Sequence, residues 1–549
     1  MRRRILFADN DGRFIKVRSE FLESKGYEIL PANSYEEAKQ ILLEEHVHLA
    51  ILDIRMTDDD DDLDTSGLIL AREEEFSSIP KIILTGFPTF EAVREALGPQ
   101  LEGLPPAVAY LAKKEGPDAM ILAVEKAFTD YVRVNWNINI HFAGKISFHH
   151  LVYLILHDSH KAVLSARVEE LRDLLRKLFF YNKQITIDRL LTTAKGQVFL
   201  EVFAFDDVKL EKQIVVSCGL KERINEESVQ YKKFNPTSAN VGSTKIHSSA
   251  ETLHFSATAY EFIENNLEET VAFKIFYRSQ PTEAVLTTLD DLYGKTLASL
   301  HKQKHSYQEG DSLRNLYEEW LQRNKVIISQ VELAHRVEAL CQAVSAAGLA
   351  HTYYTPHSLA IKLANGTYDL NFPNPITCLF NAKPEVEWLT LQGIIHGSVT
   401  GDNILINRQG DTWAINFTKT GEGPLLDDFA SLEIAVKLDL LLDRDIGACY
   451  EMEKRLLAVS RLDEDADETG SNAELQKAIL VTNRIRRWTS NYAGDALQPY
   501  LLELLFWTMC LLAKFEHEIR HTRHQLSIYL HSLLLAGMIC KKIIPLTKQ

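Results

Sequence analysis

The sequence predicts a multidomain protein: an α/β domain with a doubly wound, five-stranded parallel sheet, a helical linker, and an α+β region whose last part is largely helical. Three observations predict this. At 549 residues the chain is too long for one core, and length alone predicts three or four domains. Short apolar runs alternate with helical patterns over the first 130 residues. Strand patterns return after Gln184, and helical patterns dominate from about residue 301.

Composition excludes several classes of protein. With 46% hydrophobic and 25% charged residues, the chain is typical of soluble globular proteins. A net charge of −16 argues against nonspecific binding to nucleic acid or to an anionic membrane surface. The N-terminus lacks a signal peptide's apolar run, and no stretch reaches the roughly 18 apolar residues of a membrane span. Six scattered cysteines without a CxxC pair indicate reduced thiols, so we expect a cytoplasmic protein without a zinc site or disulfide framework.

The first 130 residues contain five units in which a strand precedes a helix. The expected strands are Arg4–Ala8, Tyr27–Leu30, Leu49–Leu52, Lys81–Leu84 and Ala107–Leu111. The expected helices are Phe14–Lys25, Tyr35–Glu45, Leu68–Glu75, Thr89–Ala96 and Pro117–Phe128. This alternation is typical of a parallel sheet, which binds ligands at the carboxyl ends of its strands.

Polar residues follow four of these strands. They are Asp9, Asn10 and Asp11 after the first, Asp53 after the third, Thr85 after the fourth and Lys113 after the fifth. Acidic oxygens suit a hard divalent cation, and an ammonium and a hydroxyl suit phosphoryl oxygens. The set therefore favours phosphoryl transfer to Asp53 as a carboxylate nucleophile.

Four motifs in this order, ILFADND, AILDIRM, IILTG and AYLAKK, closely resemble those of response-regulator receiver domains. The resemblance covers residues 1–130. It implies phosphorylation of Asp53 by a histidine kinase or phosphotransfer protein, Mg²⁺ held by Asp9 and Asp53, and Thr85, Lys113 and Tyr110 as switch residues.

Two positions depart from the family pattern. Asn10 stands where the family has a directly ligating acid, so either Mg²⁺ binds more weakly or Asp11 takes its place. Lys114 stands where a proline is usual. The alternative is that Asp53 only ends a strand in an unphosphorylated domain, and that Tyr110 only closes an edge strand. The run Asp58–Asp62 is expected to be a solvated loop.

Residues 131–183 are expected to form a helical linker. Apolar residues recur at helical spacing from Val163 to Phe180, with Glu and Arg between them, which predicts an amphipathic helix. Its position favours a role in signal transmission or in a homodimer. The alternative is that it packs on one neighbouring domain.

Residues 184–300 contain three expected strands and a helix. They are Ile185–Leu191, Val198–Phe205, Lys212–Cys218 and Glu222–Phe234. This order resembles the small lobe of kinase-like phosphotransferases, in which a glycine hairpin covers ATP and a strand lysine pairs with a helix glutamate. The match is partial. Only Gly196 remains in the hairpin, Ser217 stands at the lysine position with Lys221 four residues later, and Glu227, with Glu226 beside it, matches the glutamate.

In residues 301–549, the stretch HGSVTGDNILINRQGDTWAINF predicts a hairpin of Asn403–Ile406 and Thr412–Phe417. It resembles the catalytic loop of aminoglycoside and choline kinases. His396 and Asn403 match that pattern, whereas Ser398 replaces the substrate-orienting Asp and Asn416 replaces the metal-bridging Asp. A hydroxyl cannot act as a general base at neutral pH, and an amide removes a charge that would face Mg²⁺.

The remaining C-terminal sequence is expected to shape the larger lobe. The GEGPLLDDFASLE tail resembles that of a bacterial phosphotransferase-like group, in which Asp427 or Asp428 caps a helix. Asp402 is expected to be a turn acid, with metal binding as the alternative. Thr355–Phe380 is expected to be rich in loops. The histidines at 517, 521, 524 and 531 predict a basic, solvated helix face, with metal binding again the alternative.

Three hypotheses follow. The first is a two-component signalling protein, phosphorylated on Asp53, whose pseudokinase module acts by binding an unknown protein. The second is an active phosphotransferase gated by the receiver, which uses Lys221 and Asp402 or Asp428. The third is a scaffold with no chemistry. Because three catalytic positions are replaced, Mg²⁺ is expected at the receiver site and ATP binding by the kinase-like region is doubtful.

Overall fold

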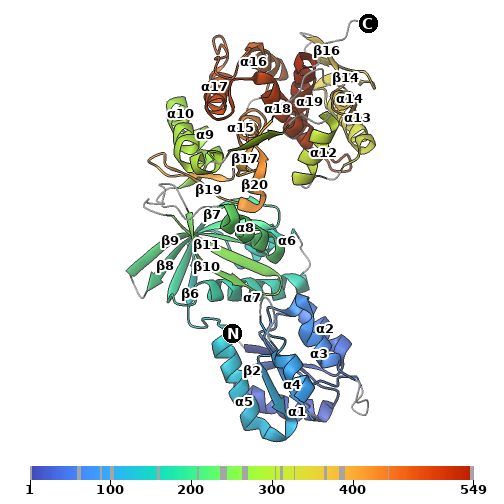
Figure 1. Cartoon of the computed structure of the whole chain (residues 1–549), viewed down its shortest axis with the longest axis vertical. Coiled ribbons are helices and arrows are strands. Elements are labelled where there is room, and N and C mark those ends of the chain that lie inside the picture. Colours follow the sequence, from blue (N-terminus) through green and yellow to red (C-terminus); the bar gives the residue numbers. More distant parts are fainter. Residues whose placement is uncertain are drawn as a thin grey trace. The chain divides into compact units, whose positions relative to one another are not determined.

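The computed structural model describes residues 3–57, 64–86, 90–98, 104–157, 161–206, 209–234, 244–262, 270–302, 304–308, 313–324, 326, 328–363, 368–381, 390–442 and 444–543. The expected Asp58–Asp62 loop lies outside these residues. The chain divides into two compact units (Figure 1). The first comprises residues 1–226 and 245–261, and the second comprises 227–244 and 262–549.

The first unit begins with a five-stranded parallel sheet in the order β2-β1-β3-β4-β5. The strands are β1 (Arg3–Ala8), β2 (Tyr27–Ala32), β3 (Leu49–Leu52), β4 (Lys81–Thr85) and β5 (Ala109–Ala112). The helices are α1 (Gly12–Ser24), α2 (Tyr35–Glu44), α3 (Ser66–Arg72), α4 (Phe90–Leu97) and α5 (Gly116–Ala127). Short helical turns η1 (Glu74–Phe76), η2 (Lys113–Glu115) and η3 (Phe128–Val132) complete it. The expected doubly wound fold is confirmed.

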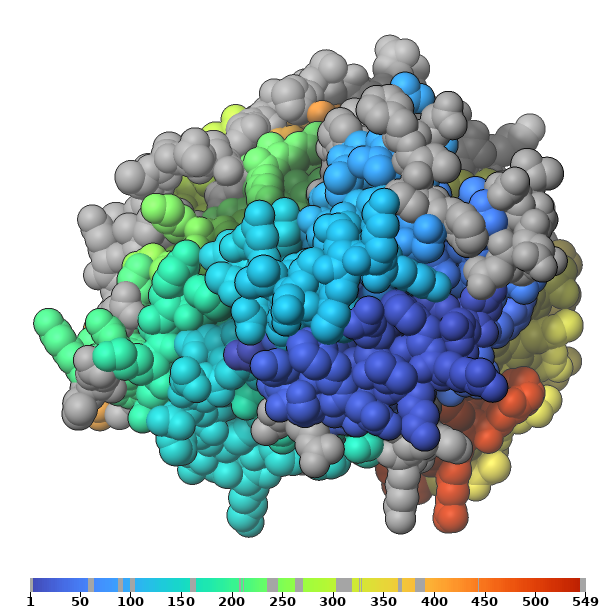
Figure 2. Space-filling view, turned by 90° about the horizontal axis from the view of Figure 1, so that it is seen from below, coloured from blue at the N-terminus to red at the C-terminus, as the bar shows by residue number. Residues whose placement is uncertain are grey.

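Two apolar clusters explain this sheet's layers. β3 is buried along its whole length, as expected for a strand covered on both faces. Leu6 and Leu52 belong to the core under α2 and α3, whereas Phe7 and Ile51 belong to the core under α5. The second core includes Val134, which follows α5. On the surface, the dark blue atoms of the N-terminal residues adjoin the lighter blue and cyan atoms of the segment that follows (Figure 2).

The rest of the first unit is a six-stranded sheet in the order β10-β11-β9-β8-β7-β6, hereafter the six-stranded domain. Its strands are β6 (Asn139–Phe142), β7 (Gln184–Ala194), β8 (Gln197–Asp206), β9 (Lys209–Leu220), β10 (Thr244–Glu251) and β11 (Phe255–Phe262). Its helices are α6 (Phe148–Leu156), α7 (Lys161–Leu178) and the start of α8 (Lys221–Phe234), which continues into the second unit.

Residues 131–183, expected as a linker, are built into the six-stranded domain. β6 pairs in parallel with β7 at one edge of the sheet. Helices α6 and α7 supply Leu151, Leu174 and Leu175 to a core that they share with β8 and β9 (Figure 1). The apolar periodicity predicted the α7 helix, but it could not show that this face packs on strands that follow in the sequence.

The second unit contains three small sheets, ordered β12-β18-β19, β13-β17-β20 and β14-β15-β16. Its strands are β12 (Val271–Ala272), β13 (Lys304–Gln308), β14 (Ala350–Tyr354), β15 (Ser358–Leu363), β16 (Asp369–Pro373), β17 (Thr390–Ile395), β18 (Ile404–Ile406), β19 (Thr412–Ala414) and β20 (Gly421–Pro424). The β18–β19 hairpin matches the predicted one. The region expected to be rich in loops instead forms β15, β16 and helix α14 (Pro375–Asn381).

Helices form most of the second unit. They are α9 (Phe273–Ser279), α10 (Thr282–Asp291), η4 (Leu292–Thr296), α11 (Ala298–His301), α12 (Leu313–Arg323), α13 (Gln330–Ala346), η5 (Phe417–Lys419), α15 (Asp427–Ile434), η6 (Ala435–Asp439), α16 (Ile446–Ala458), α17 (Ala473–Ala493), α18 (Leu497–Ala513) and α19 (Arg523–Ile543). Only α19, among the described helices, is long and apolar enough to cross a membrane. Because 78% of its most apolar window is buried, it is a core helix, as in soluble proteins.

The expected helix face of four histidines does not form. His517 and His521 lie in the segment between α18 and α19, whereas His524 and His531 lie in α19. His531 is fully buried, and its Nε2 lies 3.1 Å from Glu453. These residues therefore do not share one exposed surface.

Candidate functional site

Three charged side chains meet at the carboxyl edge of the five-stranded sheet. Asp9 follows β1, Asp53 follows β3 and Lys113 follows β5, and both carboxyl groups are buried. The Lys113 Nζ lies 2.7 Å from Asp9 Oδ2 and 2.7 Å from Asp53 Oδ2. The predicted convergence of these strand ends is therefore present in the structure.

Burial and mutual repulsion set the proton affinities of this group. Burial, together with the charge of Asp53, raises the pKa of Asp9 to about 6, although Lys113 opposes the rise. Burial lowers the pKa of Lys113, but hydrogen bonds to Asp53 and Asp9 outweigh it and raise that pKa overall. The Lys113 ammonium thus supplies the positive charge that the carboxylates of Asp9 and Asp53 attract.

The neighbours Asn10 and Asp11 differ in what their oxygens do. Asp11 Oδ1 caps α1 by accepting hydrogen bonds from the backbone N–H groups of Arg13 and Phe14. The side-chain oxygen of Asn10 is buried and accepts no hydrogen bond from the described residues. An orphaned amide oxygen beside two buried carboxylates fits Mg²⁺. Asp9, Asp53 and the Asn10 oxygen would therefore hold the ion, whereas one Asp11 oxygen is engaged elsewhere.

Gly67 fixes the backbone on which Asp53 stands. Its N–H donates to Ile54 O at 2.9 Å, so α3 begins directly against the segment that follows β3. A Cβ at position 67 would lie 1.7 Å from Asp53 O. Thr85, at the end of β4, is buried, and Tyr110, in β5, is half-buried. The structure thus places Thr85 on the strand next to β3, which Asp53 follows, and Tyr110 one strand further along the sheet.

The glycine hairpin of the six-stranded domain is bonded into its sheet. Gly196, at φ +75°, forms the turn between β7 and β8, and its carbonyl accepts the N–H of Leu220 at 2.9 Å. The turn also packs on Gly219, where a Cβ would lie 2.3 Å from Gly196 O. With its carbonyl tied to β9, the hairpin tip differs from an open loop whose N–H groups cradle phosphates.

At the strand position that carries a lysine in kinases, this chain has two uncharged side chains that hydrogen-bond to each other. Ser217 is fully buried in β9, and its hydroxyl accepts a hydrogen bond of 2.7 Å from Gln197 Nε2. Lys221, the expected substitute, lies at the start of α8 and forms an ion pair of 3.4 Å with Glu251.

In the second unit, the loop before β18 and the residues after β19 are joined by a chain of neutral side chains. Asn403 Nδ2 donates to Ser398 O at 2.9 Å and to Ser398 Oγ at 2.8 Å. Asn416 Nδ2 donates to Asn403 Oδ1 at 3.3 Å, and Thr418 Oγ1 donates to Asn416 Oδ1 at 2.7 Å. We call these four residues the amide chain. It directs each amide oxygen at a protein donor, where a kinase would direct oxygens at a cation.

Asp428 holds the loop that contains the amide chain. Its two carboxylate oxygens accept the N–H groups of His396, at 2.8 Å, and Gly397, at 2.7 Å. His301 Nε2 lies 2.9 Å from Asp428 Oδ2, and all four residues are buried. Burial raises the pKa of Asp428, but the hydrogen bond and charge of His301, together with His396, outweigh burial and lower that pKa.

These contacts correct one expectation and show how the loop is anchored. Neither Asp427 nor Asp428 caps α15 with its side chain, because both lie inside its first turn and Asp428 reaches back to the loop. The ring of His396 packs on Phe417 with centroids 5.2 Å apart, so the loop is anchored by the His396 backbone and by ring packing.

Two further acids have protein partners. Asp402 forms an ion pair with Lys274 of α9. Glu227 is fully buried, and its Oε1 accepts the N–H of Phe417 at 3.3 Å. Of the two candidates for the helix glutamate, Glu227 is therefore the buried one, whereas Glu226 is half-buried. Lys274 and His301 were missed from the sequence, because each lies far along the chain from its acid and in no motif. Thr418 could have been noticed as a hydroxyl two residues after Asn416.

Together, the strand order 2-1-3-4-5 and the two buried acids bridged by a lysine give the first domain the fold of a response-regulator receiver. The loop held by Asp428 and the hairpin after it give the second unit a kinase-like fold. The chain therefore combines a receiver-like domain with a kinase-like module.

Comparisons with known proteins are as follows. A family model described as Ternary complex associated domain 9 matches residues 367–500, in the second unit. No curated protein matches the chain by sequence.

Among solved structures, the chain is similar to a CheY-like receiver domain protein from Methanospirillum hungatei, with 23% identity, TM-score 0.21, and coverage of 24% of this chain and 97% of that one. It is also similar to response regulator protein TrrA from Thermotoga maritima, in complex with Mg²⁺ and BeF, with 27% identity, TM-score 0.20, and coverage of 23% and 98%. A third is amicoumacin kinase hAmiN in complex with AMP-PNP, Ca²⁺ and Ami, with 12% identity, TM-score 0.32, and coverage of 65% and 90%.

Proposed function

We propose that this chain is a cytoplasmic two-component signalling protein that is phosphorylated on Asp53 by a histidine kinase or phosphotransfer protein. Its kinase-like module is catalytically inactive and acts by binding another protein. The carrying observation is a contrast between two sites. Asp9, Asp53 and Lys113 form a compact charged group, whereas the amide chain contains no ionisable side chain.

At the receiver site, the residues present suit transfer of a phosphoryl group to a carboxylate. An Asp53 oxygen attacks phosphorus as the bond from phosphorus to the donor's imidazole nitrogen breaks, and the donor leaves as neutral histidine after taking up a proton. When bound, Mg²⁺ neutralises charge on the phosphoryl oxygens. Lys113 is placed to exchange its bond to Asp53 for one to the new phosphoryl oxygen, and Thr85 is the hydroxyl that we expect to follow it.

At the kinase-like site, three residues that could substitute for lost catalytic groups already have partners. Lys221 is paired with Glu251, Asp402 with Lys274, and Asp428 with His301 and two backbone amides. Because phosphoryl transfer depends on fixed charges around the metal and phosphates, a neutral site argues for binding without catalysis.

The receiver proposal predicts labelling of one residue. Acetyl phosphate with Mg²⁺ should add one phosphoryl group to the full chain, detected by intact-mass measurement, and none to Asp53→Asn. Asp118→Asn, an exposed acid of α5, is the matched control and should label like the native chain. Equal labelling of the Asp53→Asn chain would remove the receiver proposal, and no labelling of either would leave the scaffold hypothesis.

The pseudokinase proposal predicts how ATP acts on stability. Because no charged group in the amide chain attracts Mg²⁺, ATP with Mg²⁺ should shift the second unit's thermal unfolding no more than ATP with EDTA. A metal-dependent rise of more than a few degrees would contradict inactivity and favour the receiver-gated phosphotransferase. Adding Mg²⁺ without ATP controls for its effect on the receiver.

A further inference from the structure

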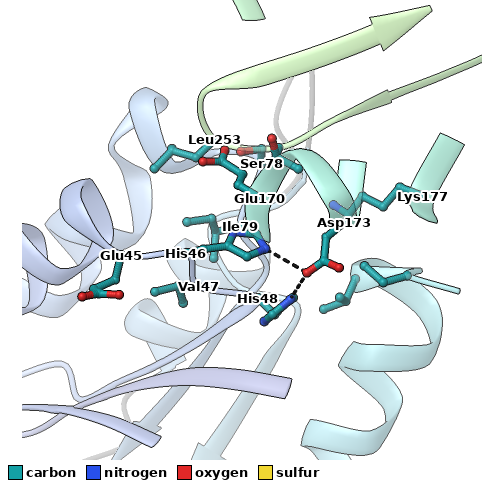
Figure 3. A pocket seen from close by; sticks show the side chains of 13 residues that line it. Glu45, His46, Val47, His48, Ser78, Ile79, Glu170, Asp173, Lys177 and Leu253 are labelled. Carbon is teal, nitrogen blue, oxygen red and sulfur yellow. Dashed lines mark hydrogen bonds and ion pairs between the residues drawn. The ribbon is translucent and has the colours of Figure 1, made fainter. Parts of the chain in front are cut away.

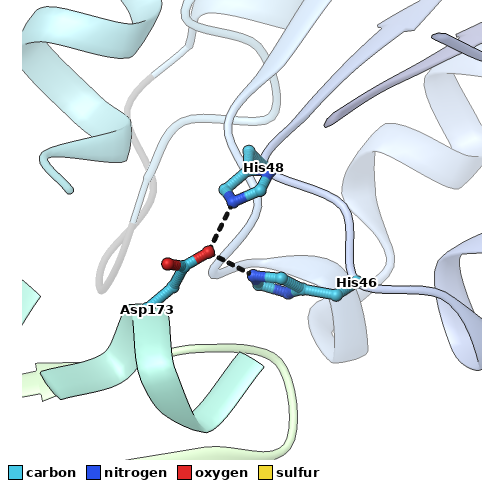
Figure 4. Close-up of side chains that lie close together, drawn as sticks. All are labelled: His46, His48 and Asp173. Carbon is cyan, nitrogen blue, oxygen red and sulfur yellow. Dashed lines mark hydrogen bonds and ion pairs between the residues drawn. The ribbon is translucent and has the colours of Figure 1, made fainter. Parts of the chain in front are cut away.

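A buried cluster joins the receiver to the six-stranded domain at the edge opposite Asp53. His46 and His48 lie just before β3, and Asp173 lies on α7. The Nε2 atoms of His46 and His48 lie 3.0 and 2.7 Å from the same oxygen, Asp173 Oδ2. Both rings point at that oxygen (Figure 4). The three residues are between 2% and 7% exposed, so these bonds are shielded from water.

The backbone fixes which nitrogen of His48 carries the proton. Arg4 N–H, on β1, donates to His48 Nδ1 at 3.0 Å, and His48 N–H donates back to Arg4 O at 3.0 Å. The imidazole thus replaces a backbone carbonyl where the β1–β3 ladder begins. Because Nδ1 accepts a bond, neutral His48 must carry its hydrogen on Nε2 and donate it to Asp173.

This tautomer argues against a metal at the cluster. The three side chains offer ligand atoms within 4.8 Å of one another, as a zinc site would. A cation on His48 Nε2, however, requires that ring's hydrogen to move to Nδ1, where it would face the Arg4 N–H. Positive charge also surrounds Asp173 already, because Arg176 NH1 donates to its other oxygen at 2.8 Å. A hydrogen on each Nε2, donated to Asp173 Oδ2, suits the geometry better than a metal ion.

Charged groups from every neighbouring element face this cluster. From α7, Arg167 donates to Leu43 O at 2.7 Å, and Lys177 lines the same cavity of about 20 Å³ as the cluster (Figure 3). Also on α7, Glu170 accepts the N–H of His254, from the turn before β11, at 2.8 Å. On the receiver side, Arg4 pairs with Glu45 at 2.9 Å and with Glu28 at 3.4 Å. The contact between the receiver and the six-stranded domain, hereafter the joint, is therefore polar. A polar contact favours a specific orientation of the two domains and reversible opening.

A second proton on His48 would break this arrangement. It could only enter at Nδ1, where it would deprive Arg4 N–H of its acceptor and set two donors face to face. Burial, with His46 and Lys177 nearby, lowers the pKa of His48 to about 4, although Asp173 opposes the fall. In an open joint, the ring would regain an ordinary pKa near 6.5. Acid therefore favours the open joint.

We propose that His46, His48 and Asp173 form a proton-operated latch between the receiver and the six-stranded domain, closed while His48 is neutral and opened when His48 takes up a second proton. The direction follows from linkage: the open form binds the proton more tightly, so the closed form loses stability as pH falls below about 6.5. The latch does not depend on phosphorylation of Asp53, so it stands or falls separately from the proposed function.

Hydrogen exchange of the full chain tests the latch. After correction for intrinsic rates, the protection factor of amides 43–48 should fall roughly 25-fold between pH 7.5 and pH 5, because two pKa values of about 4 and 6.5 differ in proton uptake by that factor. In His48→Gln, which cannot titrate but keeps a donor toward Asp173, this fall should vanish. His48→Asn, which keeps an acceptor toward Arg4, gives the same test if the first variant does not fold. His149→Gln, an exposed histidine of α6, should behave like the native chain.

Three results would overturn the proposal. One is a protection factor in the native chain that does not change with pH, and another is an unchanged fall in both His48 variants. The third is stoichiometric Zn²⁺ that raises protection of residues 43–48 in the native chain but not in Asp173→Asn, which would make the cluster a metal site. The ¹⁵N shifts of His48, measured at pH 7.5, should show an unprotonated Nδ1 and a protonated Nε2. In Asp53→Asn the pH response should persist.

Discussion

At the scale of single residues, the direction of the hydrogen bonds determines whether the kinase-like module offers free oxygen atoms to a cation. Ser398, Asn403, Asn416 and Thr418 could each have bound water or a cation, but their hydrogen bonds run in one direction from Thr418 to Ser398. Asn403 cannot reverse its amide without losing both bonds to Ser398. The amide chain is therefore an ordered network, in which each hydrogen bond depends on the orientation of the next side chain.

Restoring one acid should not restore metal binding. Asn416→Asp keeps an acceptor for Thr418, but it replaces the donor that satisfies Asn403 Oδ1 with a second acceptor. We expect a loss of about 1–3 kcal/mol in the free energy of unfolding and no Mg²⁺-dependent stabilisation by ATP. Urea denaturation and thermal shift measure both. Thr418→Val, which removes one bond without adding charge, is the control. A tight Mg²⁺ response in Asn416→Asp would show that the site is one substitution from activity.

The sequence predicted residues well where one motif carries the whole site. Asp9, Asp53 and Lys113 each follow a strand and Thr85 ends one, and parallel strands bring such residues to one edge. It predicted poorly where a partner comes from elsewhere in the chain. His46 and His48, two residues apart in an extended segment, point to one side, and this spacing was a usable signal. Nothing near Asp173 indicated that it would meet two histidines that precede it by 127 and 125 residues.

At the scale of elements, α7 shows how one helix can serve two partners. Leu171, Leu174 and Leu175 face the six-stranded sheet, whereas Glu170 and Asp173 are buried against other groups. Hydrophobic periodicity identifies only the first face, because a charged face is expected to be solvated. For that reason the sequence pattern predicts the α7 helix but not its packing, and residues 131–183 were expected to be a linker.

The start of α3 offers a test of how the acceptor strand is held. Alanine usually stabilises a helix relative to glycine by about 0.5–1 kcal/mol. Gly67→Ala should instead destabilise the receiver by roughly 2 kcal/mol or more, because its Cβ would meet Asp53 O at 1.7 Å. Acetyl phosphate labelling should fall as the Asp53 backbone shifts. Gly144→Ala, whose Cβ would meet nothing closer than 4.0 Å, is the control. A stabilised Gly67→Ala chain would contradict the close approach.

At the scale of the whole molecule, the chain is two units with separate means of stabilisation. In the second unit, Glu433 is fully buried and accepts bonds from Arg486 at 3.0 and 2.8 Å, and from Tyr500 at 2.8 Å. Burial raises the pKa of Glu433, but Arg486 and Lys437 outweigh it and hold that pKa at about 2. The charge is therefore retained at neutral pH and binds α15, α17 and α18 together.

Removing this charge should affect one unit only. Glu433→Gln leaves the buried Arg486 without its counter-ion, at an expected loss of about 3–5 kcal/mol. In calorimetry of the full chain, the unfolding transition of the second unit should move down by several degrees while that of the first stays in place. Glu332→Gln, an exposed acid paired with Arg336, should change neither. A joint shift of both transitions would show that the units unfold as one.

The amide chain has a consequence for what the second unit can sense. None of its four side chains gains or loses a proton between about pH 5 and pH 9, and none is a strong ligand for magnesium. These four side chains therefore keep the same pattern of donors and acceptors whether a cell is rich or poor in ATP, acidified or not. Under the proposed function, a partner that binds around these residues would meet a constant pattern, and the two residues proposed to respond to phosphoryl transfer and to protons, Asp53 and His48, belong to the first unit.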